Sequence, residues 1–292
     1  MPRRALRLRV GGLTLSVTAA APTARLDPPA GFRPFLASRG GGIRLRLREA
    51  PVPEPRSEDA LFRSGGVWSV FRFGAGLLYR FRTAAASPPV YKGVVIDASL
   101  ERGILFFPLP RDRRGPRYAL DYPLDELLFQ HRLAREGGLE IHACGVVTSG
   151  RVALFCGKSG AGKSTTARLW RCHRPQARIL SDDRIVLRPT GRGVMAYGTP
   201  WHGDGGFAAQ AKARLGAIFF LKKARRSRTR VIPPAAAAAR LLARSFPPPW
   251  DAEALARSLD TAAKAVEAVP CFELCFRRDV TAVQAALAAL AS

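Results

Sequence analysis

The chain has 292 residues, of which 47% are hydrophobic and 24% are charged. This length suggests about two domains of ordinary size, and the apolar content excludes wholesale disorder. No apolar run approaches the roughly 20 residues that a membrane-spanning helix needs, so we expect no membrane segment. The five cysteines are odd in number and lack paired metal-ligand spacing. These features favour a reducing compartment and predict a cytoplasmic protein.

The net charge of +25 suggests a polyanionic partner. The excess is nevertheless spread along the chain, and only seven of the 47 basic residues are lysines, which indicates a compositional bias towards arginine. One dense basic stretch spans residues 222–230. Its first interpretation is a solvated loop after a strand, and its second is a docking surface for an acidic peptide or protein. We do not expect nucleic acid as a partner, because no nucleic-acid-binding signature is present.

Residues 1–121 predict a β-rich N-terminal domain of unknown role. Apolar and arginine residues alternate before Gly11-Gly12, and the apolar alternation resumes after it. This period of two around a glycine pair is typical of a β-hairpin and not of a signal peptide. Further strands are expected within residues 42–47, 67–81, 90–96 and 103–107, and an exposed turn at residues 111–117.

Residues 122–292 predict a second domain in which helices and strands alternate, which indicates an α/β fold. A helix is expected to start at Tyr122-Pro123, with the proline just inside it, because Leu124, Leu127, Leu128, His131 and Leu133 have helical spacing. A later helix should include residues 235–239, and Asp279 should cap the last one.

Two pairs of residues in this second part of the chain, two histidines and two cysteines, are weaker candidates for a functional role. His131 and His173 are interpreted as surface or helix residues. The strand at residues 271–276 should direct its phenylalanines and Leu274 towards the core. Its two cysteines, Cys271 and Cys275, would share the other face, without the spacing of a redox pair.

The strongest motif is a match to the P-loop pattern G-x-x-x-x-G-K-[ST], between a strand-like run at 151–156 and a helix-like run at 164–170. Glycines let backbone N–H groups turn inward, and a helix N-terminus adds partial positive charge for phosphate. Lys163 would contact the β- and γ-phosphates of ATP, and the Ser164 hydroxyl would hold Mg²⁺. The predicted nucleotide-binding residues are Gly157, Lys158, Ser159, Gly160, Ala161, Gly162, Lys163, Ser164 and Thr165.

An acidic pair follows the next predicted strand. Asp182 and Asp183 end the apolar run that begins at Ile179. Alone, such a pair most often forms a turn or a helix cap. After a P-loop it predicts a division of labour, in which one carboxylate binds Mg²⁺ and the other accepts a proton from an attacking hydroxyl.

His142, the P-loop and the Asp pair, in this order, resemble the HPr kinase/phosphorylase family. That family shares its catalytic fold with ATP-dependent phosphoenolpyruvate carboxykinase. The resemblance covers roughly residues 122–230 and implies an α/β P-loop catalytic domain preceded by a smaller β-rich domain. It implies Mg-ATP-dependent phosphorylation of a serine hydroxyl, with Asp183 as the favoured base and His142 near the transferred phosphate. Taken alone, a histidine on a strand such as His142 is more often a core residue.

The chain departs from the family after the Asp pair. The Glu-Ile-Arg-Gly signature of true HPr kinases is missing, and residues 197–204 stand in its place. This segment resembles one in HPr-kinase-like proteins, some of which act on peptide precursors. His202 or Asp204 would then supply the missing phosphate or metal contact, which makes Ser164, Asp182 and Asp204 the predicted metal ligands. The alternative is a Gly/Pro-rich loop with Trp201 buried.

Two functions follow from these residues. The first is a kinase that transfers the γ-phosphate of ATP to a serine of a peptide or small protein, with Asp183, Asp182, Lys163 and His142 as catalytic residues. The second is a nucleotide-binding regulatory module with little or no phosphotransfer, which the missing signature motivates. The sequence leaves open the acceptor, a reverse phosphorolysis reaction and whether the chain forms a homo-oligomer.

Overall fold

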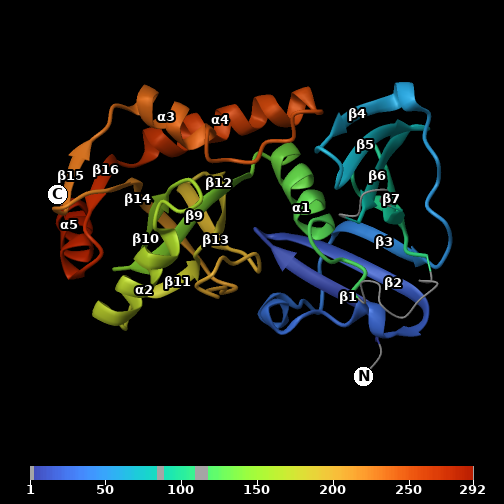
Figure 1. The fold of residues 1–292 in the computed structure, drawn as a ribbon, viewed down its shortest axis with the longest axis horizontal. Coiled ribbons are helices and arrows are strands. Elements are labelled where there is room, and N and C mark those ends of the chain that lie inside the picture. Colours follow the sequence, from blue (N-terminus) through green and yellow to red (C-terminus); the bar gives the residue numbers. More distant parts are fainter. Residues whose placement is uncertain (1–2, 84–88, 109–117, 292) are drawn as a thin grey trace. The chain divides into compact units, whose positions relative to one another are not determined.

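The computed structural model describes residues 3–83, 89–108 and 118–291. Within them the chain is a mixed α/β protein with two eight-stranded sheets, one in each of two compact units (Figure 1). The first unit comprises Met1–Arg132 with Pro249–Asp251, and the second comprises Leu133–Pro248 with Ala252–Ser292. The two units thus divide later in the chain than residue 121, within helix α1 (Leu124–Arg135). In the described ranges, no helix is long and apolar enough to cross a membrane.

The first unit begins with the predicted hairpin. Strands β1 (Arg3–Val10) and β2 (Leu13–Thr23) pair antiparallel, and Gly11 and Gly12 both have positive φ in the turn between them. Positive φ at both central residues matches the right-handed twist of the strands and is tolerated best by glycine. The leucine and valine side chains of β1 and β2 are buried, as the alternation predicts.

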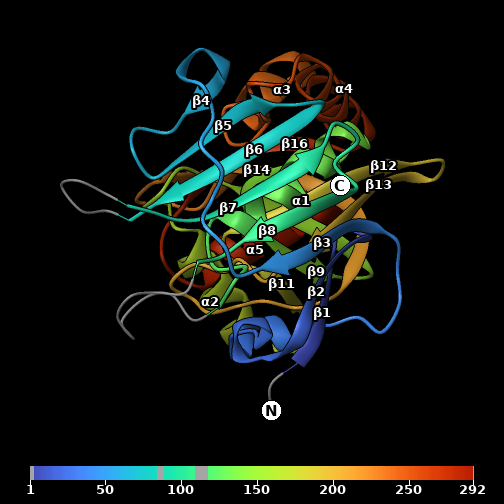
Figure 2. The same cartoon turned by 90° about the vertical axis from the view of Figure 1, so that its right-hand side faces the viewer.

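The sheet of the first unit has the strand order β1-β2-β3-β8-β7-β6-β5-β4, which can be followed in Figure 2. The β2–β3 and β3–β8 pairs are parallel and the others are antiparallel. The expected strands are therefore confirmed, while the expected turn at residues 111–117 lies outside the described residues. The remaining elements of this unit are β3 (Gly42–Arg48), β4 (Ala60–Arg63), β5 (Trp68–Phe73), β6 (Gly76–Arg82), β7 (Val90–Asp97), β8 (Arg102–Phe106) and the short 3-10 helices η1 (Ala24–Leu26), η2 (Ala30–Phe35) and η3 (Ser57–Asp59).

His131 lies on helix α1, as predicted, but it is fully buried and not at the surface. Its Nδ1 lies 2.5 Å from the Tyr79 hydroxyl, and its Nε2 lies 2.6 Å from a carboxylate oxygen of Asp251. A polar side chain is accepted in the interior when both of its polar atoms have partners. The partners come from strand β6 and from a segment 120 residues further along the chain, so helical spacing alone could not reveal them. His173, in contrast, ends helix α2 and is exposed.

In the second unit, the strand pairings form a closed ring. Strand β9 pairs with β10 and β12, β12 pairs with β13, β13 with β14, and β14 returns to β10. Strands β16 and β15 extend the sheet from β14, and β11 pairs with β9. The bounds are β9 (Leu139–Thr148), β10 (Arg151–Cys156), β11 (Arg178–Ser181), β12 (Arg184–Thr190), β13 (Gly193–Gly198), β14 (Lys212–Lys223), β15 (Arg228–Val231) and β16 (Cys271–Phe276).

Strands β10, β11, β14 and β16 all run in one direction. β14 is parallel to both β10 and β16, and β11 has the direction of β10 because both are antiparallel to β9. The P-loop after β10 and the Asp pair after β11 therefore leave the sheet at the same edge. Crevices outside the carboxyl ends of parallel strands are where α/β sheets bind ligands.

Helices cover the central strands of this sheet on both faces. Helices α2 (Lys163–His173) and α5 (Val280–Ala291) pack on one face, and α3 (Pro234–Leu242) and α4 (Ala252–Ala268) pack on the other. The backbone N–H of Thr281 donates to Asp279, which confirms the expected cap of α5. Strand β16 is consequently buried on both sides, so the expectation that Cys271 and Cys275 face away from the core is wrong.

The dense basic stretch is exposed but is not a loop throughout. Lys222 and Lys223 end β14, and Arg228 and Arg230 belong to β15. Pairing of β15 with β16 extends regular structure into a segment whose composition alone suggests a solvated connection.

Gly198 ends β13 where the chain enters the loop over the Asp pair. A Cβ at this position would lie 2.8 Å from the carbonyl oxygen of Leu180, and still closer to that of Ala209. We expect Gly198→Ala to lower the free energy of unfolding by about 1–3 kcal/mol, because the added methyl group could be accommodated only by shifting the backbone at Leu180 and Ala209. Gly191→Ala, with nothing within 4 Å of its Cβ, should change it by less than about 0.5 kcal/mol. Urea unfolding of both variants tests this, and equal losses would contradict it.

Candidate active site

The P-loop of the second unit has the predicted order of strand, glycine-rich turn and helix. It connects the buried strand β10 to helix α2, which begins at Lys163. Gly160 and Gly162 have φ of +72° and +111°, in the left-handed region. A Cβ on Gly162 would also lie 2.5 Å from the Phe276 ring. Both the positive φ and this close packing therefore require glycine at position 162. Lys158, Ser159 and Gly160 are exposed at the turn, and Ala161, Ser164 and Thr165 are half-buried.

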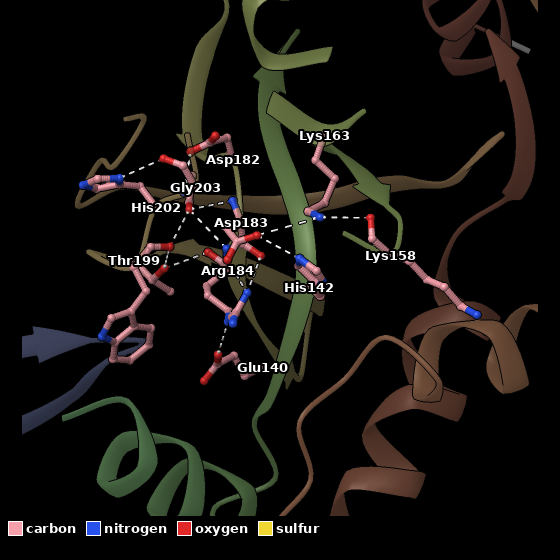
Figure 3. A network of polar contacts seen from close by, with 12 residues as sticks. Glu140, His142, Lys158, Lys163, Asp182, Asp183, Arg184, Thr199, His202 and Gly203 are labelled. Carbon is pink, nitrogen blue, oxygen red and sulfur yellow. Dashed lines mark hydrogen bonds and ion pairs between the residues drawn. The ribbon is translucent and has the colours of Figure 1, made fainter. Parts of the chain in front are cut away.

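Lys163 is buried, although its ammonium group faces polar atoms. Nζ lies 3.2 Å from the carbonyl oxygen of Gly157 and 3.4 Å from that of Lys158. It also lies 3.8 Å from Oδ1 of Asp183, which brings the P-loop and the Asp pair together (Figure 3). Burial lowers the pKa of Lys163, and the carboxylate of Asp183 opposes this effect.

Three basic side chains surround the carboxylate of Asp183, two in hydrogen bonds and Lys163 in an ion pair. Nε2 of His142, on β9, lies 2.8 Å from Oδ1 of Asp183, and the Arg184 guanidinium donates to Oδ2 (Figure 3). Burial would raise the pKa of Asp183, but the hydrogen bond with His142 and the charges of Arg184 and Lys163 outweigh it and hold the pKa below its usual value. The carboxylate is therefore ionised at neutral pH. His142 belongs to the site and is not a residue of the apolar core.

Arg184 and Glu140 belong to this network and were not expected from the sequence. The Arg184 Nε lies 3.1 Å from Oε1 of Glu140, whose side chain is fully buried on β9. The guanidinium also lies 4.4 Å from the centre of the Phe246 ring. The register pairs Arg184 with His142, so adjacent strands deliver both to Asp183. A charged residue beside an Asp pair was the only available signal in the sequence.

Asp182 has different surroundings from its neighbour. It is fully buried, and its Oδ1 accepts hydrogen bonds from the backbone N–H groups of Gly203 (3.0 Å) and Phe207 (3.3 Å). Its Oδ2 accepts from the N–H of Gly205 at 2.8 Å. One carboxylate thus organises the loop at residues 203–207, in the manner of an anion held in a ring of amides.

Ser181 and Thr199 hold the same loop from the other side. The Ser181 hydroxyl donates to the carbonyl oxygen of Trp201 and accepts from the N–H of Asp183, while the Thr199 hydroxyl donates to the carbonyl oxygen of Arg184. Trp201 is buried, with 8% of its surface exposed. The segment at residues 197–204 thus begins with the last two residues of β13 and continues as a loop with a buried tryptophan, and this loop contacts the Asp pair.

The predicted metal ligands are brought together only in part. A Cβ on Gly203 would lie 3.1 Å from Oδ2 of Asp182 and 3.4 Å from Oγ of Ser164, so both oxygens approach the same glycine. Hard oxygen donors of this kind suit Mg²⁺, which usually keeps several waters and takes few protein ligands. Asp204 and His202 are exposed, and the only bond of Asp204 within the described ranges is from Arg168 to its carbonyl oxygen. Among the described residues, no group of three His, Cys, Asp or Glu side chains forms a metal site.

Comparison of the sequence with known protein families and with curated proteins finds no match.

Replacing Asp182 tests its bonds to the loop. In Asp182→Asn, the amide loses the charge and turns an NH₂ group towards backbone donors, so we expect a loss of about 1.5–3 kcal/mol in unfolding free energy. The exposed side chain of Asp204 makes Asp204→Asn the matched control, for which no loss is expected. Urea unfolding, with limited proteolysis of residues 202–208, measures both. An unchanged Asp182→Asn protein would show that these bonds do not hold the loop.

The lowered pKa of Asp183 has a consequence for stability. Because the folded-state pKa lies below the unfolded value of about 3.9, ionised Asp183 adds stability that is complete above that value and is lost as the pH falls through the folded-state pKa. The difference in unfolding free energy between the natural protein and Asp183→Asn should therefore be constant near neutrality and shrink on acidification. Urea unfolding at a series of pH values measures it, and a difference that grows in acid would contradict the expectation.

Proposed function

We propose that the second unit is a Mg-ATP-dependent kinase of the HPr kinase-like type, which transfers the γ-phosphate to a serine hydroxyl of a peptide or small protein. The observation that carries the proposal is the 3.8 Å approach of the P-loop ammonium of Lys163 to the carboxylate of Asp183. A phosphate-binding cation and an ionised carboxylate at one sheet edge are the two groups that phosphoryl transfer to a hydroxyl requires.

The P-loop would hold the phosphates of ATP. The left-handed conformation of Gly160 and Gly162 opens the turn, and the α2 N-terminus favours negative charge. Lys163 would exchange the two loop carbonyls for phosphate oxygens. Ser164 Oγ and Asp182 Oδ2, which both approach Gly203, are the oxygens that would hold Mg²⁺, which neutralises charge on the phosphates when bound.

Asp183 would orient and deprotonate the acceptor. The serine oxygen forms a bond to the γ-phosphorus, the bond from that phosphorus to the bridging oxygen of ADP breaks, and the serine proton passes to Asp183. His142 and Arg184 each hold one oxygen of the carboxylate, which fixes its direction. The order of His142, P-loop and Asp pair supports a catalytic domain of the HPr kinase and phosphoenolpyruvate carboxykinase type, in a cytoplasmic protein whose five cysteines are free.

One observation favours the second candidate, a nucleotide-binding regulatory module. Three backbone N–H groups already occupy the Asp182 carboxylate, which leaves it little capacity for a metal ion. A kinase needs that capacity, whereas a module that only binds nucleotide needs less of it.

The test separates binding from transfer. With Mg-ATP, the natural protein should gain thermal stability by mass action, Lys163→Ala should lose that gain, and Asp183→Asn should keep it. With γ-labelled ATP and a size-fractionated extract of the host, label should appear in a peptide or protein with the natural protein and fall at least about 100-fold with Asp183→Asn.

The outcomes identify which proposal fails. Stabilisation by Mg-ATP without any labelled product would favour the regulatory module. Unchanged stabilisation of Lys163→Ala would overturn both, because each depends on the P-loop. Glu267→Gln is the matched control for Asp183→Asn, since it removes an equal charge from an exposed position on α4, away from the candidate site.

A further inference from the structure

The sheet of the first unit has an unusual row of arginines. In β3, Arg44 and Arg46 are exposed, while Ile43 and Leu45, which alternate with them, are buried. The register aligns Arg7 with Ser16, Ser16 with Arg44, and Arg44 with Arg102. These residues lie side by side across four adjacent strands, β1, β2, β3 and β8, which can be followed in Figure 2. Residues that are direct partners in a ladder share one face of the sheet.

The row carries more positive than negative charge. Arg44 and Arg102 are direct cross-strand partners, and like charges in this relation destabilise a sheet. Arg44 reaches Glu101 only at 3.9 Å, with both side chains exposed. Arg7 and Arg46 have no ion pair within the described residues. Asp97 also lines the cleft, where its carboxylate accepts hydrogen bonds from Ser99, Glu101 and Arg102 and has the charge of Arg102 nearby.

The arginines surround a cleft with an apolar floor. The cleft has a volume of about 900 Å³ and is lined by Arg7, Arg44, Arg46 and Arg102 together with Phe73, Val95 and Ile104. These three apolar side chains are half-buried and present apolar surface to the cleft. A second hollow of about 610 Å³ shares Arg46 and Ile104 with it and continues along β3 to Arg48. The hollowed face is therefore elongated as well as cationic.

We propose that this cleft, lined by Arg7, Arg44, Arg46 and Arg102, binds an extended acidic peptide segment. Carboxylates of the segment pair with the arginines and relieve the repulsion between Arg44 and Arg102. Side chains on the alternate positions cover Phe73, Val95 and Ile104, because successive residues of an extended chain point to opposite sides. A nucleic acid backbone supplies the charge but no apolar side chains for this floor. The proposal is independent of the kinase activity proposed for the second unit.

Fluorescence anisotropy of the full chain with synthetic peptides tests the proposal. The probe is a short fluorescein-labelled peptide in which glutamate and valine alternate. We expect Arg44→Gln/Arg102→Gln to weaken its binding at least about tenfold, a change of about 1.4 kcal/mol. The matched control is Arg171→Gln/Arg192→Gln, which removes the same charge from exposed positions of the second unit and should leave binding within about twofold. Thermal unfolding verifies that both variants are folded.

Two further probes decide the chemistry of the ligand. Glutamine in place of valine should weaken binding several-fold if the apolar floor contributes, and lysine in place of glutamate should abolish it. Equal losses in the two double variants would reduce the effect to net charge and overturn the proposal. Tighter binding of a single-stranded oligonucleotide, or no binding of the acidic peptide, would overturn it as well. If Arg44→Gln/Arg102→Gln does not fold, Arg46→Gln with Arg192→Gln as its control gives the same comparison.

Discussion

The candidate site depends on the way in which two adjacent carboxylates are separated. Asp182 and Asp183 leave the end of β11 together, and two like charges this close would repel if they shared one environment. The turn at Ser181 directs them apart. Asp182 enters a ring of backbone N–H groups, and Asp183 meets His142, Lys163 and Arg184. Each charge is thus compensated by its own set of donors.

This separation connects parts of the chain that are far apart in sequence. The bonds of Asp182 hold the loop at residues 203–207, and the contacts of Asp183 reach β9 and the P-loop. A buried charge is costly unless it is paired and hydrogen-bonded, so the buried Asp182 needs the loop amides, and the half-buried Asp183 is compensated by its three basic partners. The loop at residues 203–207, the P-loop and the start of β12 at Arg184 are therefore all held by contacts with Asp182 and Asp183.

The sequence reveals the parts of this site that rest on local pattern. A P-loop is readable because its glycines, lysine and serine occur at fixed spacing between a strand and a helix, and the structure has that order. The contacts of Asp182 with the loop were not predictable, since backbone donors carry no signature in the sequence. The same holds for Glu140, which supports Arg184 from a neighbouring strand through the register of β9 and β12. Likewise, the burial of His131 depends on partners 52 and 120 residues away.

On the proposed function, the position of Lys163 couples nucleotide binding to the reactivity of Asp183. In this structure the ammonium is shared between two loop carbonyls and the Asp183 carboxylate. Phosphate oxygens are stronger partners for it than neutral carbonyls, so a bound nucleotide draws the cation from Asp183. Loss of one nearby positive charge raises the affinity of a carboxylate for a proton. His142 and Arg184 keep the carboxylate in place meanwhile, so its basicity increases while its direction does not change. As the proposed base, Asp183 would therefore become effective only when the phosphate that it serves is present.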